Sequence, residues 1–351
     1  MNIEAVDLFC GAGGLSYGLI KAGINVKAGI DFEPMCAFPF EENVANAKFI
    51  QDDISQVSSQ TISLEYSYNS IKLLAGCAPC QPFSTLRNGT IRESSDKWPL
   101  LNHFSRIIKE IKPDLVTMEN VPTLRTEAIF DSFVKTLKCE GYEIFYQVIN
   151  AADYGVAQRR KRLVLLASKF GAIRLLSPVE LGIKPITVFD AISSLPHIKA
   201  GASCKADPLH KARALTPLNK KRIMASRPGG NWLDWPLKLR SPCHLKESGA
   251  TFKSVYARME WDKPSPTITT QSTNFGTGRF GHPEQHRALS LREMAILQSF
   301  PKDYKFVENG SEFSMTSIGK LIGNAVPVNL GYAIGKSFTH HIAFHNKKKE
   351  S

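Results

Sequence analysis

The sequence predicts an α/β protein with a mostly parallel, doubly wound sheet and a smaller, loop-rich second domain. In the first half of the chain, short apolar strands alternate with helical segments, as in 5–9 and 15–22. From about 171 to 270 this alternation fades, and prolines, glycines and basic residues accumulate. A helical pattern returns at 291–299 and at 323–338. These observations predict a large α/β domain interrupted by a second domain.

The strands expected in the first half end at glycine-rich or polar residues. The first is followed by a glycine turn, and the second, 26–30, ends at Asp31. Further strands are expected at 72–76, 114–118 and 162–167, with a helix at 100–111. Because parallel strands end at one edge of a sheet, where such proteins bind ligands, the polar residues after these strands should form one site.

Composition and charge exclude several classes of protein. The 43% hydrophobic and 22% charged residues are typical of a globular chain and exclude a disordered or fibrous one. Without an apolar run of eighteen residues or a secretory leader, we expect no membrane span and a cytoplasmic location. A net charge of +12 suits a nucleic-acid partner, although many soluble proteins are mildly basic. Seven cysteines, an odd number, indicate reduced thiols.

The glycine turn suggests a nucleotide-like ligand. Gly11, Gly13 and Gly14 lie where a strand is followed by a helix, so the backbone there can approach a ligand closely. The spacing differs from the G-x-G-x-x-G of dinucleotide-binding proteins. Asp31 can accept hydrogen bonds from ribose hydroxyls. The turn alone fits many nucleotide-binding loops, so a nicotinamide-dependent oxidoreductase remains an alternative at this point.

A thiol, an acid and a pair of arginines follow or precede neighbouring strands: Cys80, Glu119, and Arg160 with Arg162. A cysteine acts as a nucleophile where a positive neighbour or a hydrogen-bond donor lowers its pKa. Cys77 and Cys80 also form a C-x-x-C pair, but no second Cys or His pair has ligand spacing, so we expect no metal. Taken singly, a Glu or an Arg run usually faces solvent. Together these groups indicate a catalytic site.

Several short motifs follow one another along the chain. They are Asp7-Leu8-Phe9-x-Gly11-x-Gly13-Gly14, Asp53-Ile54, Pro79-Cys80-Gln81, Glu119-Asn120-Val121, Gln158-x-Arg160-x-Arg162, RALSLREMAILQSFP at 287–301, and Gly323-Asn324-Ala325-Val326. This ordered set resembles the cytosine-C5 DNA methyltransferase family, of the prokaryotic restriction-modification type. The resemblance implies a Rossmann-like, S-adenosylmethionine-dependent catalytic domain at 1–172 and 318–345. It also implies a target-recognition domain at 173–317, with the family's post-recognition motif at 287–301.

The resemblance implies an enzyme that flips a cytosine out of a specific sequence in double-stranded DNA. A methyl group would pass from S-adenosylmethionine to C5 of the base, leaving S-adenosylhomocysteine. Cys80 would add covalently to C6, Glu119 would contact or protonate N3, and Arg162 would hold the O2 side, with Arg160 in the same motif. A cognate restriction endonuclease would be the functional partner, against which methylation protects host DNA.

The same resemblance assigns residues to the methyl donor. Phe9 is expected to stack on adenine, Phe32 to pack on it, and Asp31 to bind the ribose, although the family commonly has Glu at that position. The full set expected to contact the cofactor is Phe9, Gly11, Gly13, Gly14, Asp31, Phe32, Asp53, Ile54, Pro79, Asn324 and Val326.

Basic and polar residues in two regions are expected to contact DNA. The loop 85–97 would close over DNA after flipping, the alternative being a mobile surface loop. Residues of 173–270 would read the target, although Trp232 and Trp235 equally suit the core of a small domain. The expected contacts are Gln81, Ser84, Arg87, Arg92, Arg227, Asn231 and Arg240. Residue types do not reveal which base pairs are read.

Other functions share some of these features. An RNA cytosine methyltransferase has the same catalytic motifs, but the Cys-Phe-Thr signature typical of that branch is absent. A catalytically inactive DNA-binding homologue would have lost Cys80, Glu119 or Arg162, and all three are present. The oxidoreductase alternative rests on the glycine turn alone. A further hypothesis is a reversible, inactivating disulfide between Cys77 and Cys80.

Overall fold

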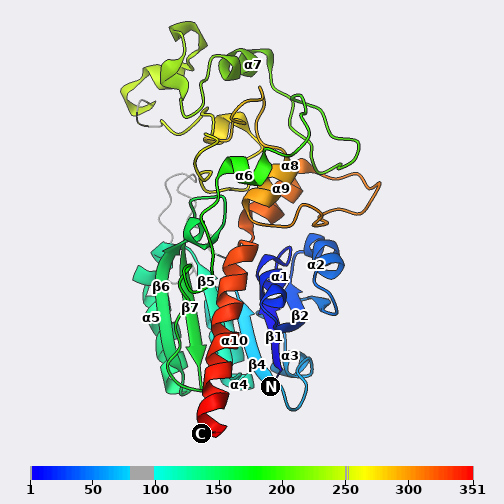
Figure 1. Ribbon diagram of the computed structural model, residues 1–351, viewed down its shortest axis with the longest axis vertical. Helices are drawn as coiled ribbons and strands as arrows, with labels where there is room; N and C mark the ends of the chain where they lie inside the picture. The colour runs from blue at the N-terminus through cyan, green and yellow to red at the C-terminus, as the bar shows by residue number, and fades with distance from the viewer. Residues whose placement is uncertain (1, 80–98, 250, 252, 351) are drawn as a thin grey trace. The chain divides into compact units, whose positions relative to one another are not determined.

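The computed structural model describes residues 2–79, 99–249, 251 and 253–350. The chain forms two compact units. Figure 1 colours the chain from blue at the N-terminus to red at the C-terminus. The first unit consists of Met1–Tyr154, Lys161–Ile183 and Val326–Ser351, and the second of Gly155–Arg160 and Lys184–Ala325. Contacts thus group 173–183 with the first unit and 318–325 with the second. The domain boundaries expected from the sequence, at 172/173 and 317/318, remain predictions about function.

The first unit is built around a seven-stranded sheet in the order β3-β2-β1-β4-β5-β7-β6. Its strands are β1 (Ile3–Leu8), β2 (Asn25–Asp31), β3 (Lys48–Gln51), β4 (Ile71–Gly76), β5 (Leu115–Asn120), β6 (Glu143–Asn150) and β7 (Lys161–Ser168). The pairs from β3 to β5 are parallel, whereas β7 runs antiparallel to β5 and β6. The predicted α/β class with a mostly parallel sheet is therefore confirmed.

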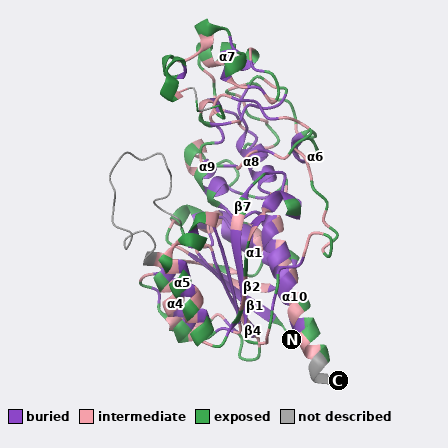
Figure 2. Cartoon of the chain, turned by 90° about the vertical axis from the view of Figure 1, so that its left-hand side faces the viewer, coloured by how far each residue is buried: buried purple, intermediate pink, exposed green. Residues whose placement is uncertain are grey.

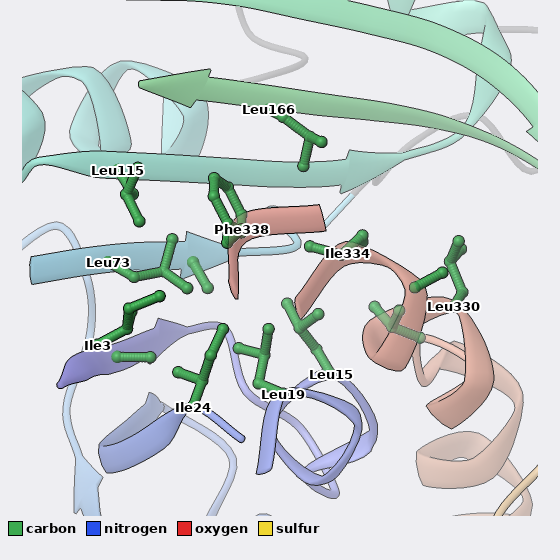
Figure 3. Close-up of a cluster of buried hydrophobic side chains, with 14 of the residues drawn as sticks. Ile3, Leu15, Leu19, Ile24, Leu73, Leu115, Leu166, Leu330, Ile334 and Phe338 are labelled. Atoms are coloured by element: carbon green, nitrogen blue, oxygen red, sulfur yellow. The ribbon is translucent and has the colours of Figure 1, made fainter. Parts of the chain in front are cut away.

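Helices cover both faces of this sheet, because alternate side chains of each strand point to opposite faces. On one face, Ile3 and Ala5 of β1 pack with α1 (Gly14–Lys21) and α10 (Val328–Glu350). Figure 3 shows Leu15, Leu19, Ile334 and Phe338 converging there on strand residues. On the other face, Val6 and Leu8 belong to the cluster of α3 (Ser59–Ser63), α4 (Pro99–Ile111) and α5 (Ala128–Cys139). The central strands are accordingly buried (Figure 2). One further helix of this unit, α2 (Ala37–Asn43), lies between β2 and β3 in the chain.

Helices α1 and α10 pack so closely that their contact requires glycine. A Cβ atom on Gly18 would lie 2.4 Å from the carbonyl oxygen of Val328 and 2.6 Å from the backbone nitrogen of Tyr332. Both atoms belong to the backbone, so neither can rotate away as a side chain would. The sequence alone gives Gly18 no role, whereas the structure gives it a packing role.

The helix expected at 323–338 is present from Val328 onward as part of α10, but its expected start is wrong, because two helices meet in that region. Helix α9 (Met315–Asn324) ends before Pro327, and α10 begins at Val328. Proline disfavours the helical conformation of the residue before it, so the chain must leave the helix near Val326. The predicted helix at 291–299 is confirmed as α8 (Leu291–Leu297). Among the described residues, no helix is both long enough and apolar enough to cross a membrane.

The second unit is rich in loops, as expected. Its remaining helices are α6 (Val188–Ile192), α7 (Pro217–Met224) and the single-turn 3₁₀ segments η5 (Trp232–Asp234), η6 (Leu237–Leu239), η7 (Pro242–Leu245), η8 (Glu247–Gly249) and η9 (Phe275–Thr277). Trp232 and Trp235 are only 1% and 2% exposed and form a cluster with Ile223 and Phe275. Both tryptophans are therefore core residues, as one of the two sequence interpretations held.

Buried arginines tie the loops of the second unit together. The Arg258 guanidinium donates to the carbonyl oxygens of Ile223, Ser226 and His282, and burial lowers its pKa to about 10. Arg287 and Glu293 are almost inaccessible to solvent and form a two-pronged ion pair, with both N–O distances 2.7 Å. In a region with few regular backbone hydrogen bonds, such side chains supply the donors that buried carbonyls need.

Candidate active site

The glycine turn follows β1 in the chain and is hydrogen-bonded to the end of the neighbouring strand β2. Gly11 and Gly13 have φ values of +52° and +83°, in the left-handed region that favours glycine. The backbone N–H of Gly11 donates to Asp31 Oδ2 at 2.9 Å, and that of Glu33 donates to Oδ1 at 3.0 Å. Although these bonds favour the carboxylate, burial dominates and raises the pKa of Asp31. The turn is thereby held against the end of the second strand.

Two aromatic residues flank this turn. Phe9 has a φ of 59°, which is uncommon for a residue with a side chain and occurs mostly at functional sites. Phe32 is 62% exposed, although it follows a buried strand directly. An exposed phenyl ring beside a glycine turn provides a flat apolar surface on which a planar ligand can pack.

The other residues expected to bind the methyl donor occupy different surroundings. In the first unit, Asp53 is exposed and accepts from the N–H of Ser55, Ile54 is buried in the core beside α4, and Pro79 is exposed. Val326 is buried in the cluster that contains α1. Asn324 belongs to the second unit, where it is the exposed last residue of α9.

Asp7, to which the sequence interpretation gave no role, lies at the end of β1 just before the turn. Its side chain is only 1% exposed, and Oδ2 accepts a hydrogen bond from Ser16 Oγ at 2.6 Å. Among the described residues, no donor reaches Oδ1. Burial, with a smaller effect of the Asp31 charge, raises the pKa of Asp7 to about 7. An acid within the otherwise apolar run Ala5-Val6-Asp7-Leu8-Phe9 was the sequence signal that could have identified it.

Glu119 and Arg162 come together because β5 and β7 are neighbours. Glu119 pairs with Val164 in the antiparallel register, so Arg162 occupies a diagonal position on the same face. Arg162 Nε lies 2.9 Å from Glu119 Oε1, and the carboxylate is almost fully buried. A buried acid with an arginine partner can hold a polar ligand through both charges.

The two oxygens of Glu119 have different surroundings. Oε2 accepts from the thiol of Cys77, with an Sγ–Oε2 distance of 3.0 Å. Oε1 is close to Arg162, but the Nε–H is not directed well enough for a hydrogen bond, and no other donor among the described residues reaches this oxygen. Because buried acceptors are nearly always satisfied, Oε1 is suited to receive a donor from a ligand.

Asn120 attaches the loop after β4 to the end of β5. Its Nδ2 donates to the carbonyl oxygen of Ala78 at 3.0 Å, and its Oδ1 accepts from the N–H of Val121 at 2.8 Å. The sequence interpretation quoted Asn120 in a motif without giving it a task.

Some of the predicted site lies outside the described residues. This holds for the loop 85–97 and for five predicted site residues, Cys80, Gln81, Ser84, Arg87 and Arg92. The hypothesised Cys77–Cys80 disulfide therefore stays a prediction.

Arg160, grouped with the catalytic residues from the sequence, makes its contacts within the second unit. It is 4% exposed and donates to the carbonyl oxygens of Ile268 and Gly323 at 2.9 and 3.2 Å. Gln158, two residues earlier, bonds to Gln298 and to the backbone of Ile268. These bonds give Arg160 a role in holding the second unit together, and its expected contribution to catalysis stays a prediction.

The three residues of the second unit that were predicted to contact DNA differ in their exposure and in the hydrogen bonds they already make. Arg227 is 77% exposed and lies 3.4 Å from Asp234. Asn231 caps η5 by accepting from the N–H of Leu233. Arg240 donates to the carbonyl oxygen of Leu233 and lies over the Trp232 ring. Arg227 is thus the most accessible of the three and the more accessible of the two cations.

Comparisons with known proteins agree on one family. Residues 3–340 match the family described as C-5 cytosine-specific DNA methylase. The Type II methylase M.HgiDII of Herpetosiphon aurantiacus is 47% identical over 335 residues, covering 95% of this chain and 94% of the relative. The Type II methyltransferase M.Sau96I of Staphylococcus aureus is 30% identical, covering 97% and 76%. The structure of the Entamoeba histolytica methyltransferase EhMeth, 16% identical, superposes with a TM-score of 0.67 over 97% and 99% of the two chains.

Proposed function

The chain belongs to the C-5 cytosine-specific DNA methylases, and from this premise we propose which residues carry out the reaction and which methyl donor they use. The protein is a DNA cytosine-5 methyltransferase related to Type II enzymes of restriction-modification systems. Its substrates are therefore DNA and a methyl donor. Membership of the family fixes neither the methyl donor nor the tasks of single residues, which depend on the geometry of the site.

The proposed methyl donor is S-adenosylmethionine, which carries its transferable methyl group on a positively charged sulfonium. Two buried or half-buried carboxyl groups, those of Asp7 and Asp31, stand beside the glycine turn and suit a cationic ligand. Asp7 Oδ1 is an acceptor that no described residue satisfies. The exposed ring of Phe32 and the left-handed Gly11, where an added Cβ would meet no atom within 4 Å, leave room for a nucleoside. These residues fit the donor.

The proposed chemistry overcomes the weak nucleophilicity of cytosine C5. The Cys80 thiolate adds to C6 while N3 takes up a proton from solvent, and the electron pair that reaches C5 attacks the methyl group, whose bond to the sulfonium sulfur breaks. The C5 proton is then removed, Cys80 leaves as the thiolate and N3 gives back its proton, which restores the neutral aromatic ring. All of these groups must reach one base, so the cytosine has to leave the duplex.

The observation that carries this proposal is the buried Glu119–Arg162 pair, with its 2.9 Å separation. In the proposed role, the unsatisfied Glu119 Oε1 accepts a hydrogen bond from N3 once N3 is protonated, and the Arg162 guanidinium holds the O2 side. When both contact the base, the positive charge of Arg162 would also favour the anionic form of the Cys80 thiol. The arrangement recognises cytosine and activates it with the same two side chains.

The net charge of +12 and the accessible Arg227 support contacts with the phosphates of double-stranded DNA. We assign to the second unit the reading of a target sequence, with the residues that contact bases to be found among its exposed side chains. A restriction endonuclease with the same target is the proposed functional partner, since methylation would protect host DNA from it.

The decisive experiment is covalent trapping on duplex DNA that contains 5-fluorocytosine, which blocks the final elimination. Wild-type protein with S-adenosylmethionine should form an adduct at Cys80, whereas Cys80→Ser should bind DNA and the donor but form no adduct. Cys204→Ser, which changes a half-buried thiol of the second unit, is the control and should behave as wild type. An adduct at another residue, or turnover by Cys80→Ser, would refute the assignment. A tRNA pool methylated in parallel tests the RNA alternative.

A further inference from the structure

Cys77 lies outside every motif that carries the family resemblance, yet its thiol contacts the buried carboxylate of Glu119. The contact follows from the register of the sheet. Gly76, the last residue of β4, is paired with Met118 of the parallel strand β5. The next residues along these strands are Cys77 and Glu119, and Sγ lies 3.0 Å from Oε2.

The direction of this hydrogen bond is set by chemistry. A carboxylate only accepts hydrogen bonds, so the thiol S–H must be the donor. The rest of the Cys77 side chain packs against the buried cluster on the α1 face of the sheet. The thiol is therefore fixed by packing on one side and by a polar contact on the other.

The thiol limits how Glu119 can turn. The terminal torsion of a Glu side chain is broad, so burial alone does not set the orientation of its carboxylate. Here Arg162 lies on Oε1 at 2.9 Å and the Cys77 thiol lies on Oε2. With a different group on each oxygen, rotation of the carboxylate would break one contact. Oε1, the oxygen without a directed donor, is thereby kept on the Arg162 side.

We propose that Cys77 is a positioning residue for methyl transfer, whose S–H donates to Glu119 Oε2 and so presents Oε1 to the target cytosine. This inference rests on the proposed role of Glu119. It goes beyond that role because it assigns a task to a residue outside the family's motifs. A residue that serves only to fill space would tolerate any side chain of similar size, whereas a positioning residue must keep its donor.

The test compares three substitutions at this position by the rate of a single turnover, which excludes product release from the measurement. Cys77→Ser keeps a donor and should stay within about threefold of wild type. Cys77→Ala and Cys77→Val remove the donor, Ala with a loss of volume and Val with a gain, so a change of size in one direction cannot explain a slower rate in both. Each should reduce the rate by about tenfold, the size of one hydrogen bond to a charged group. The dissociation constants for DNA and S-adenosylmethionine should change less than twofold, and Cys204→Ala is the control.

A spectroscopic readout separates the inference from the proposed function. The infrared S–H stretch of Cys77, identified by its loss in Cys77→Ser, should lie below that of a free thiol and should shift in Glu119→Gln. Wild-type rates in Cys77→Val, or an S–H band insensitive to Glu119, would overturn the positioning role. Failure of the proposed function has a different signature, because Glu119→Gln would then methylate at the wild-type rate whatever stands at residue 77.

Discussion

Asp7→Asn tests whether this buried acid lowers stability at neutral pH. The side chain is 1% exposed, one oxygen accepts from Ser16, and the other accepts from no described donor. Burial raises the pKa of Asp7 from 3.8 to about 7. Above that pH the folded protein must hold a buried carboxylate that has no cationic partner among the described residues. Asparagine occupies the same space and still accepts from Ser16, but it carries no charge.

The sign and size of the effect follow from proton linkage. Because the pKa is higher in the folded state, the folded protein binds the proton more tightly, and this contribution to stability is lost as pH rises through about 7. A rise of about three units corresponds to about 4 kcal/mol, of which about 3 kcal/mol falls between pH 5 and pH 8.5. The free energy of unfolding of Asp7→Asn, relative to wild type, should therefore increase by about 3 kcal/mol over this interval.

The assay is urea unfolding followed by far-UV circular dichroism at several pH values. His282, whose pKa burial lowers to about 3, titrates in both proteins, so its contribution cancels in the difference. The N–H₂ group that Asp7→Asn introduces lacks a partner and adds an offset that does not depend on pH, so the slope is the test. Asp131→Asn, which removes an exposed carboxylate, should show no such slope. A flat difference for Asp7→Asn would refute the argument.

Three further predictions concern packing, a buried ion pair and DNA. Gly18→Ala places a Cβ 2.4 Å from a backbone oxygen of α10 and should lower the free energy of unfolding by about 1–3 kcal/mol; an unchanged urea midpoint would contradict this. Arg287→Leu leaves Glu293 buried without its partner and should destabilise by about 3–5 kcal/mol in thermal unfolding, whereas a surface pair would change little. Arg227→Ala should reduce the slope of log K for DNA binding against log salt concentration by about one; Arg240→Ala, which removes bonds to backbone carbonyls, should instead reduce stability.

Much of the fold could be predicted from local patterns, and the exceptions have physical causes. The strands near 5–9, 26–30 and 72–76 are short and apolar, and the structure contains them. β6 was not predicted, because it is an edge strand whose residues are mostly exposed or half-buried and whose apolar residues are interrupted by Gln147. The antiparallel direction of β7 depends on which strands become neighbours, and no local pattern encodes that choice.

The site shows the same division between local and tertiary information. That Glu119 and Arg162 act together could be predicted only from the resemblance of their motifs to the family, because Glu119 lies at the end of β5 and Arg162 at the beginning of β7, and these two ends meet only since β7 runs antiparallel. The thiol contact of Cys77 could not, since it depends on the register between β4 and β5. Arg160 reaches carbonyl oxygens of residues more than a hundred positions away, and only the folded chain reveals such partners.

The order of the strands arranges charge along the active edge of the sheet. Across the sheet, in the spatial order β2-β1-β4-β5-β7, the strands reach this edge near Asp31, Asp7, Cys77, Glu119 and Arg162 respectively. Neighbouring strands are about 4.8 Å apart, so these five positions span about 19 Å. The carboxyl groups of β1 and β2 suit the cationic donor proposed there, and the only cation of the five is on the side proposed for the base. The loop after β4, which leads to the proposed nucleophile, lies between them. A methyl group moving from the proposed donor position to the proposed base position would therefore cross the edge near β4.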